Sequence, residues 1–233
     1  MFTRQDCALF WNSIAMNAPI VQCQTGVTLI AGGPVLARDL RAALGFAPVL
    51  VAVDGGADRA LGLGMRPAAV IGDMDSISGA ARAGLADVLH FVPEQESTDF
   101  DKALRHVAAP FVLVLGCLGG RVDHELAVLS VLVQRTGMPC VLIGREDVIF
   151  AAPPVLDIAL RAGDRVSLFP MVPVTGRSTG LKWPIAGLAF APDGRVGTSN
   201  EALGRVRLDM DAPGMLVIVP RARLGVALAA LVP

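Results

Sequence analysis

The 233-residue sequence predicts a three-layer α/β domain built on a parallel sheet, followed by a small all-β sandwich domain. Between about residues 27 and 144, short apolar runs rich in β-branched residues alternate with segments of helical periodicity. After about residue 145, the apolar runs are separated only by Gly, Pro and Asp turns. We therefore expect an N-terminal extension, an α/β domain and a β-sandwich domain over 1–26, 27–148 and 149–233.

Six strands are expected in the first domain, because each is a short apolar run of the kind that lies buried in a parallel sheet. They are 27–33, 48–56, 68–76, 87–93, 110–120 and 138–144. The segments between several of them space their apolar residues for one face of a helix. The predicted helices are 34–44, 57–64, 97–107 and 123–137, and Thr98 and Asp101 in the third have the spacing of a capping box.

The second domain is expected to consist of short strands at 147–160, 164–173, 187–200, 204–210 and 214–220. Turn residues separate them, as in the "APDG" segment at 191–194, where proline fixes φ and glycine accepts a positive φ. No convincing helix is expected until the last few residues of the chain.

Composition excludes several classes of function. The net charge is −1 and no Lys/Arg cluster is present, so binding to nucleic acid or to a membrane surface has no electrostatic support. The longest apolar runs, such as 110–120 and 224–233, are shorter than the roughly 20 residues of a membrane-spanning helix. The first residues lack the basic end and unbroken apolar stretch of a secretory signal, so we expect a cytoplasmic protein.

Four cysteines are present, at positions 7, 23, 117 and 140, and no two form a CxxC pair. Cys117 and Cys140 lie inside apolar runs, which predicts buried free thiols. The three histidines are scattered, and this distribution disfavours a zinc site.

Acidic residues and glycines gather where the predicted strands end. Ligands of parallel α/β sheets bind outside the carboxyl ends of the strands, so these residues are expected to share one crevice. Carboxylates brought together in this way repel one another, which favours a hard cation such as Mg²⁺ with a phosphate-bearing substrate. Each acid taken singly is also a common turn former or helix cap. The strand ends carry Gly32, Gly33, Asp54, Gly55, Gly56, Asp73, Asp75, Glu94, Glu96, Asp99, Gly119, Gly120, Arg121, Asp123 and His124.

Six motifs carry a resemblance to a known family. They are "DGGADRAL" (54–61), "GDMDSI" (72–77), "STDFDKAL" (97–104), "GGRVDHELA" (119–127), "GLKWPI" (180–185) and "TSNEA" (198–202). In this order and spacing the sequence resembles the thiamine pyrophosphokinase (thiamine diphosphokinase) family. The resemblance implies an α/β domain followed by a β-sandwich. It also implies a homodimer in which thiamine binds where the catalytic domain of one chain meets the β domain of the other.

The resemblance also implies the reaction, in which the hydroxyl of thiamine attacks the β-phosphorus of ATP to give thiamine diphosphate and AMP. Mg²⁺ is the implied cofactor, with Asp73, Asp75 and Asp99 as its ligands. These three residues with Arg121 and Asp123 form the expected catalytic set. The residues expected to contact ATP are Gly32, Gly33, Asp54, Gly55, Gly56, Lys102, Arg121 and His124, and those expected to contact thiamine are Gln95, Trp183, Ser199 and Asn200.

Three other functions compete with this interpretation. A phosphatase of the haloacid dehalogenase type also uses an Asp-x-Asp pair, but expects it after the first strand, whereas Asp73 and Asp75 follow the third. A related pterin diphosphokinase would share part of the acidic edge, and a thiamine-nucleotide sensor would have a degenerate site. The second-half motifs favour thiamine over pterin, and the intact acids Asp73, Asp75 and Asp99 argue against a sensor.

Overall fold

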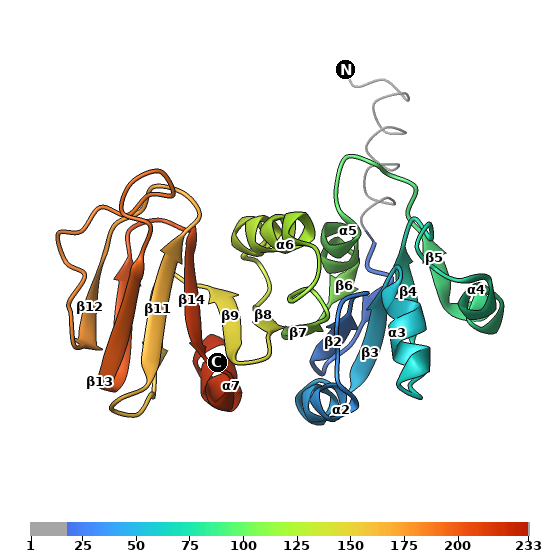
Figure 1. Ribbon diagram of the computed structural model, residues 1–233, viewed down its shortest axis with the longest axis horizontal. Helices are drawn as coiled ribbons and strands as arrows, with labels where there is room; N and C mark the ends of the chain where they lie inside the picture. Colours follow the sequence, from blue (N-terminus) through green and yellow to red (C-terminus); the bar gives the residue numbers. More distant parts are fainter. Residues whose placement is uncertain (1–17, 233) are drawn as a thin grey trace, which may run out of the picture.

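The computed structural model describes residues 18–232, and its two halves lie side by side in Figure 1. The N-terminal half, drawn in blue to green, carries helices on a parallel sheet. The C-terminal half, drawn in orange and red, is built of antiparallel strands. The predicted fold class is therefore confirmed.

The parallel sheet has the order β8-β7-β2-β3-β4-β5. The chain lays down β2 to β5 in one direction and then returns to place β7 on the other side of β2. This reversal puts a topological switch point between β2 and β7, where ligands of open α/β sheets bind. All six predicted strands are confirmed, with the bounds β2 (Val27–Ile30), β3 (Val49–Val53), β4 (Ala69–Gly72), β5 (Leu89–Phe91), β7 (Val112–Leu115) and β8 (Cys140–Ile143).

Helices cover both faces of this sheet, because alternate residues of each buried strand point to opposite sides. Ile30 packs in the same core as Leu40 of α2 (Ala37–Phe46) and Ala60 of α3 (Gly56–Gly62). Leu29, the preceding residue, packs instead with residues of α5 (Asp99–Arg105) and α6 (Val122–Gln134). The four predicted helices are confirmed. The short α4 (Gly79–Gly84) and the 3₁₀ turn η1 (Ala86–Val88) were not expected.

Thr98 caps α5 as its spacing predicts, since its side chain accepts a hydrogen bond from Asp101 N at 3.2 Å. The reciprocal half of the predicted capping box is not made, because Asp101 binds two arginines instead. Within the expected N-terminal extension, β1 (Val21–Gln22) pairs in parallel with β6 (Val107–Ala108), next to α5.

The C-terminal half contains β9 (Asp147–Ala151), β10 (Val155–Ile158), β11 (Arg165–Pro170), β12 (Gly176–Leu181), β13 (Thr198–Met210) and β14 (Met215–Pro220). The long β13 pairs with β11 through its first residues and lies between β10 and β12 through its last. Strand β12 was not predicted. The strand expected at 187–200 begins only at Thr198, and before it Phe190 makes isolated bridges.

Hydrogen bonding continues across the expected domain boundary. Strand β9 pairs antiparallel with β8 on one side and with β14 on the other, so one sheet runs through both halves. The boundary drawn at 148/149 falls inside this strand and stays a prediction. The predicted C-terminal helix is confirmed as α7 (Leu224–Leu231), which follows η2 (Arg221–Arg223). Within 18–232, no helix is long and apolar enough to cross a bilayer.

Candidate active site

A pocket of about 600 Å³ opens at the switch point of the parallel sheet. Its wall is made by the segments that follow β2, β3, β4 and β7, together with α5 and the start of α6. Ten of the residues expected to bind metal, ATP or thiamine line it: Gly32, Gly33, Asp54, Gly55, Asp73, Gln95, Asp99, Lys102, Arg121 and His124. Gly56, Asp75, Asp123, Trp183, Ser199 and Asn200 do not line it.

Backbone packing explains two of the glycines. Gly33 N donates to Gly116 O at 2.9 Å, and a Cβ on Gly33 would lie 2.4 Å from that oxygen. A Cβ on Gly56 would lie 1.9 Å from Ile30 O, where α3 starts against β2. These positions require glycine because two backbones meet there. A contact with substrate stays a prediction for Gly32, Gly33 and Gly55, which face the pocket.

Three carboxylates converge at the ends of β3 and β4. Oxygens of Asp54, Asp73 and Asp75 all lie within 4.8 Å of one another. Asp54 is only 5% exposed. Its Oδ2 accepts from Ser76 N at 3.3 Å, while its Oδ1 is buried without a hydrogen-bond partner in the described structure. Burial, reinforced by the negative charges of Asp99 and Asp75, raises the pKa of Asp54.

Lys102 lies beside this group with its side chain 1% exposed. Its Nζ is 3.1 Å from Asp73 Oδ2 and 2.9 Å from Asp99 Oδ1. Burial by itself would raise the pKa of Asp73. The hydrogen bonds from Lys102, Asp75 N and Gln95 outweigh it and lower that pKa. Asp99 thus lies against the Lys102 ammonium. The expected metal ligands were Asp73, Asp75 and Asp99, but the three carboxylates that lie close together are those of Asp54, Asp73 and Asp75.

The donor set fits a hard divalent cation. Carboxylate oxygens are the ligands that Mg²⁺ takes in proteins, and the partnerless Oδ1 of Asp54 is an oxygen that a cation would satisfy. A cation would also offset the burial and the charge repulsion that raise the pKa of Asp54.

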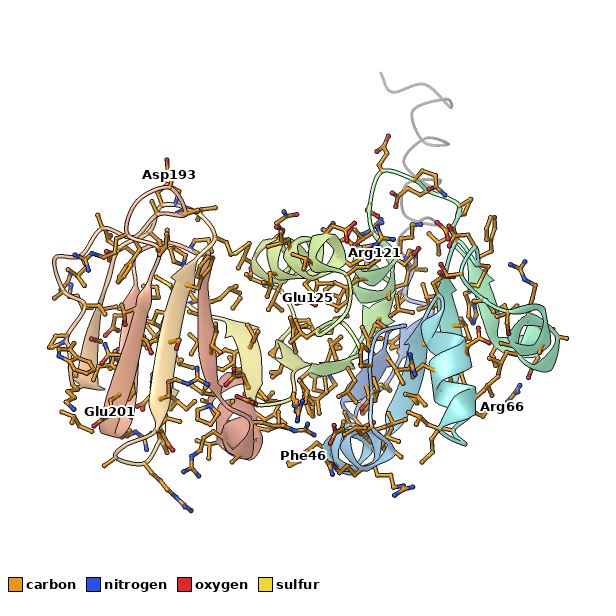
Figure 2. The ribbon with its side chains drawn as sticks, viewed as in Figure 1. Phe46, Arg66, Arg121, Glu125, Asp193 and Glu201 are labelled. Carbon is orange, nitrogen blue, oxygen red and sulfur yellow. The ribbon has the colours of Figure 1, made fainter. Side chains whose placement is uncertain are left out.

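The rim of the pocket is made by the start of α6. Arg121 forms a two-pronged pair with Asp123 in which the Nε–Oδ1 and Nη2–Oδ2 distances are 3.1 and 2.6 Å. Both side chains are exposed, and the Arg121 guanidinium lowers the pKa of Asp123 to about 2. Arg121, labelled in Figure 2, and His124 line the pocket.

A network that the sequence did not reveal supports α5, the helix that carries Asp99 and Lys102. Asp101 is 5% exposed and accepts from Arg135 Nε at 2.7 Å, Arg135 Nη2 at 3.0 Å and Arg105 Nε at 3.1 Å. Arg105 also donates to Ser97 Oγ at 2.8 Å. Asp101 belongs to a recognised motif, but its partner Arg135 is 34 residues away and shows no signal in the sequence.

Three of the four residues expected to bind thiamine, Trp183, Ser199 and Asn200, lie on the sandwich, whereas Gln95 lines the acidic pocket. Trp183 is 56% exposed and Ser199 is exposed, while Asn200 is 3% exposed. Asn200 Oδ1 accepts from Trp183 N at 3.2 Å and its Nδ2 donates to Trp183 O at 2.7 Å. Figure 2 shows the neighbouring Glu201 on the far side of the sandwich from Arg121.

Comparisons with known proteins match both halves of the chain. The model for "Thiamin pyrophosphokinase, catalytic domain" matches residues 40–142. The model for "Thiamin pyrophosphokinase, vitamin B1 binding domain" matches residues 155–214.

Individual relatives and solved structures agree with these matches. Thiamine pyrophosphokinase 1 of Oryza sativa is 27% identical over 71% of this chain and 80% of its own length. Thiamine pyrophosphokinase of Bacillus subtilis is 28% identical over 83% of this chain and 97% of its own. Thiamin pyrophosphokinase from Candida albicans has a TM-score of 0.71 at 18% identity, with coverage of 87% of this chain and 94% of that one. The Bacillus subtilis crystal structure has a TM-score of 0.66 at 24% identity, with coverage of 84% and 98%. At these identities the two structures show the fold alone.

Proposed function

The chain belongs to the thiamin pyrophosphokinase family, and from this premise we propose that it transfers the pyrophosphoryl group of ATP to the hydroxyl of thiamine. The products are thiamine diphosphate and AMP. The observation that carries the proposal is the acidic pocket at the switch point, in a chain whose second half matches a vitamin B1 binding domain. Pyrophosphoryl transfer requires mainly positioning and charge neutralisation, and such a pocket is suited to both.

Mg²⁺ is the cofactor that we propose for this site. When bound, it would neutralise phosphate oxygens and orient them for in-line attack. Asp73 and Asp75 are its proposed ligands on two grounds, because the family resemblance and the structural cluster both include them. The third ligand is Asp99 by the resemblance and Asp54 by the cluster. Asp54→Asn and Asp99→Asn separate these two proposals, since loss of the true ligand weakens Mn²⁺ binding measured by calorimetry.

Arg121 and Lys102 are the cations that we propose for the phosphates of ATP. Arg121 is exposed at the rim and has only Asp123 as an ion-pair partner among residues 18–232, so its guanidinium can turn toward an incoming polyphosphate. Lys102 lines the pocket, but its ammonium is already shared between Asp73 and Asp99. Its main role is therefore to neutralise carboxylates, with phosphate as a further partner when ATP is present.

The competing functions have less support. The Asp73–Asp75 pair follows β4, and not the first strand of the sheet as a haloacid dehalogenase phosphatase requires. A pterin diphosphokinase does not account for the vitamin B1 binding match over 155–214. A non-catalytic sensor does not need the clustered carboxylates.

An assay of AMP formed from ATP and Mg²⁺, with and without thiamine, tests the function. We expect AMP only with thiamine, in equal amount to thiamine diphosphate. Asp73→Asn, which is nearly isosteric, should keep the fold and remove most of the activity because a ligand charge is lost. Thiamine-independent AMP formation, or none at all, would contradict the proposal.

A homodimer with shared sites is the assembly that we propose. Among residues 18–232, every residue that lines the acidic pocket precedes Leu129 in the sequence, while Trp183 is exposed on the sandwich. In this proposal one chain supplies the ATP half of a site from its acidic pocket and a second copy supplies the thiamine half from its sandwich. A cytoplasmic location stays a prediction.

Mixing two impaired variants tests this assembly, with thiamine kept at a concentration at which Trp183→Ala alone has little activity. Asp73→Asn damages only the acidic pocket and Trp183→Ala damages only the sandwich surface. A mixed dimer would therefore contain one site with both halves intact. We expect activity to return after subunit exchange, up to one site per mixed dimer. A mixture that stays inactive after exchange has been verified by mass spectrometry would rule out shared sites.

A further inference from the structure

We infer that Glu125 is a positioning residue that fixes the glycine loop 116–121 from outside the pocket and so sets the location of Arg121. The inference rests on the proposed function, because it assigns Glu125 to the ATP half of the site. Glu125 lies in the first turns of α6, four residues after Arg121, and both are labelled in Figure 2.

The contact that carries the inference joins one carboxylate oxygen to two successive backbone donors. Glu125 Oε1 accepts from Gly119 N at 2.8 Å and from Gly120 N at 2.9 Å. Gly119 has a φ of +80°, a backbone conformation that residues other than glycine rarely adopt. The two N–H groups converge on one point only while the loop keeps this turn. The carboxylate therefore selects one conformation of a segment that glycine would otherwise leave free.

Among residues 18–232, no other side chain accepts a hydrogen bond from Gly119 N or Gly120 N. Arg121 is the N-cap residue and makes no side-chain capping bond. The far end of the loop is held by the bond from Gly33 N to Gly116 O at 2.9 Å. The loop is thus fixed at Gly116 by the β2 side of the pocket and at Gly119–Gly120 by Glu125, immediately before the residue that carries the rim cation.

Glu125 lies outside the pocket, so its role differs from that of a residue that contacts substrate. Gly120, Arg121 and His124 line the pocket, whereas Gly119 and Glu125 do not. A carboxylate beside a phosphate site could instead compete with the phosphate for the two N–H groups. The two roles predict opposite signs, since removing a competitor would tighten ATP binding and removing a support would weaken it.

Three substitutions at Glu125 distinguish the contribution of side-chain length from that of the negative charge. Glu125→Gln keeps an acceptor oxygen at the same reach but loses the charge, Glu125→Asp keeps the charge but is shorter, and Glu125→Ala loses both. Glu146→Ala, at an exposed glutamate in the β8–β9 turn, is the control. The readouts are the KM for ATP, the KM for thiamine, kcat, and amide hydrogen exchange of the peptide that spans 117–121.

We expect Glu125→Ala and Glu125→Asp to raise the KM for ATP roughly 5- to 50-fold with little change in the KM for thiamine, and to speed exchange at 117–121. Glu125→Gln and Glu146→Ala should stay close to the unmodified protein in both measurements. Unchanged exchange in Glu125→Ala, or a lower KM for ATP, would overturn the inference. If the unmodified protein has no thiamine-dependent activity, the proposed function fails, and the exchange data still decide whether Glu125 holds the loop.

Discussion

The charge balance of the pocket depends on Lys102. Its ammonium is within 3.1 Å of both Asp73 and Asp99, and its side chain is 1% exposed. Without a cation at that place, two carboxylates would face each other in a partly desolvated site. The structure thus gives Lys102 a role in the metal-free protein in addition to the phosphate contact that its motif predicts.

Replacement of this lysine tests that role. Lys102→Met should destabilise the metal-free protein by about 2–4 kcal/mol, because it leaves two carboxylates without their cation. Mg²⁺ should restore part of the loss by neutralising the same oxygens. Thermal unfolding with and without Mg²⁺ measures both effects. Lys182→Met removes a lysine whose ion pair is exposed and should cost less than about 1 kcal/mol. Equal losses of stability in Lys102→Met and Lys182→Met would contradict the role assigned to Lys102.

Trp183 and Asn200 should respond differently although they lie together. Trp183→Ala should change stability little because the ring is 56% exposed. Its loss should raise the KM for thiamine roughly 10- to 100-fold by removing an aromatic contact. Asn200→Ala should raise the same KM and also cost about 1–3 kcal/mol, since Trp183 N and O lose their partner. Steady-state kinetics and thermal unfolding separate the two residues. A large stability loss in Trp183→Ala with an unchanged KM would remove this residue from the thiamine site.

At the scale of secondary-structure elements, the site depends on how α5 and α6 are joined. α5 carries Asp99 and Lys102, α6 begins beside Arg121, and Asp101 of α5 binds Arg135 at the far end of α6. Arg105 extends the same network to the loop before α5 through Ser97. The network therefore holds together two neighbouring helices that both line the pocket.

Removing one charge from this network should loosen both helices. Asp101→Asn should cost about 1.5–3 kcal/mol, because its buried carboxylate receives three charge-assisted hydrogen bonds. Amide exchange should increase over 94–105 and at the end of α6. Asp87→Asn is the matched control, since the Asp87–Arg66 pair is exposed and its loss should leave unfolding unchanged. A stable Asp101→Asn protein with unaltered exchange would show that the network is dispensable.

At the scale of the whole molecule, one sheet and an ion pair between Arg221 and Asp39 join the two halves. β9 pairs with both β8 and β14, and Arg221 after β14 reaches Asp39 of α2 at 2.8 Å. Arg223 binds Asp164 through two bonds of 2.7 and 2.8 Å, which tie the start of α7 to the turn before β11. The C-terminal segment therefore contacts both halves of the fold.

The Asp164–Arg223 pair predicts a pH dependence of stability. Arg223 lowers the pKa of Asp164 below its ordinary value of 3.8. A depressed folded-state pKa contributes stability that is present above pH 3.8 and is lost as the pH falls through the lower folded value. Asp164→Asn should therefore lower the Tm by a few degrees at neutral pH, and this difference should shrink below about pH 4. Asp209→Asn, at an exposed pair with Arg207, is the control and should have little effect. A Tm difference that grows toward low pH would contradict the sign.

The sequence by itself determined the fold class, the six parallel strands and the acidic character of their carboxyl ends. These features depend on local apolar runs and on the residues that follow each run, as at Asp54 after β3 and Asp73 after β4. Helix α4 was missed because it consists mainly of Gly and Ala, and strand β12 because it consists mainly of Gly and polar residues, so neither shows a strong apolar period. The strand expected at 187–200 was placed too early, since its turn residues form a loop before Thr198.

Only the tertiary structure decided which side chains meet. Lys102 and Asp73 are 29 residues apart, Asp101 and Arg135 are 34 apart, and Asn200 reaches back 17 residues to Trp183. The spacing of apolar residues in the sequence indicates whether one segment forms a helix or a strand. It does not specify which oxygen faces which nitrogen once strands and helices have packed. The membership of the carboxylate cluster, which contains Asp54 with Asp73 and Asp75, is likewise decided by how the strand ends pack.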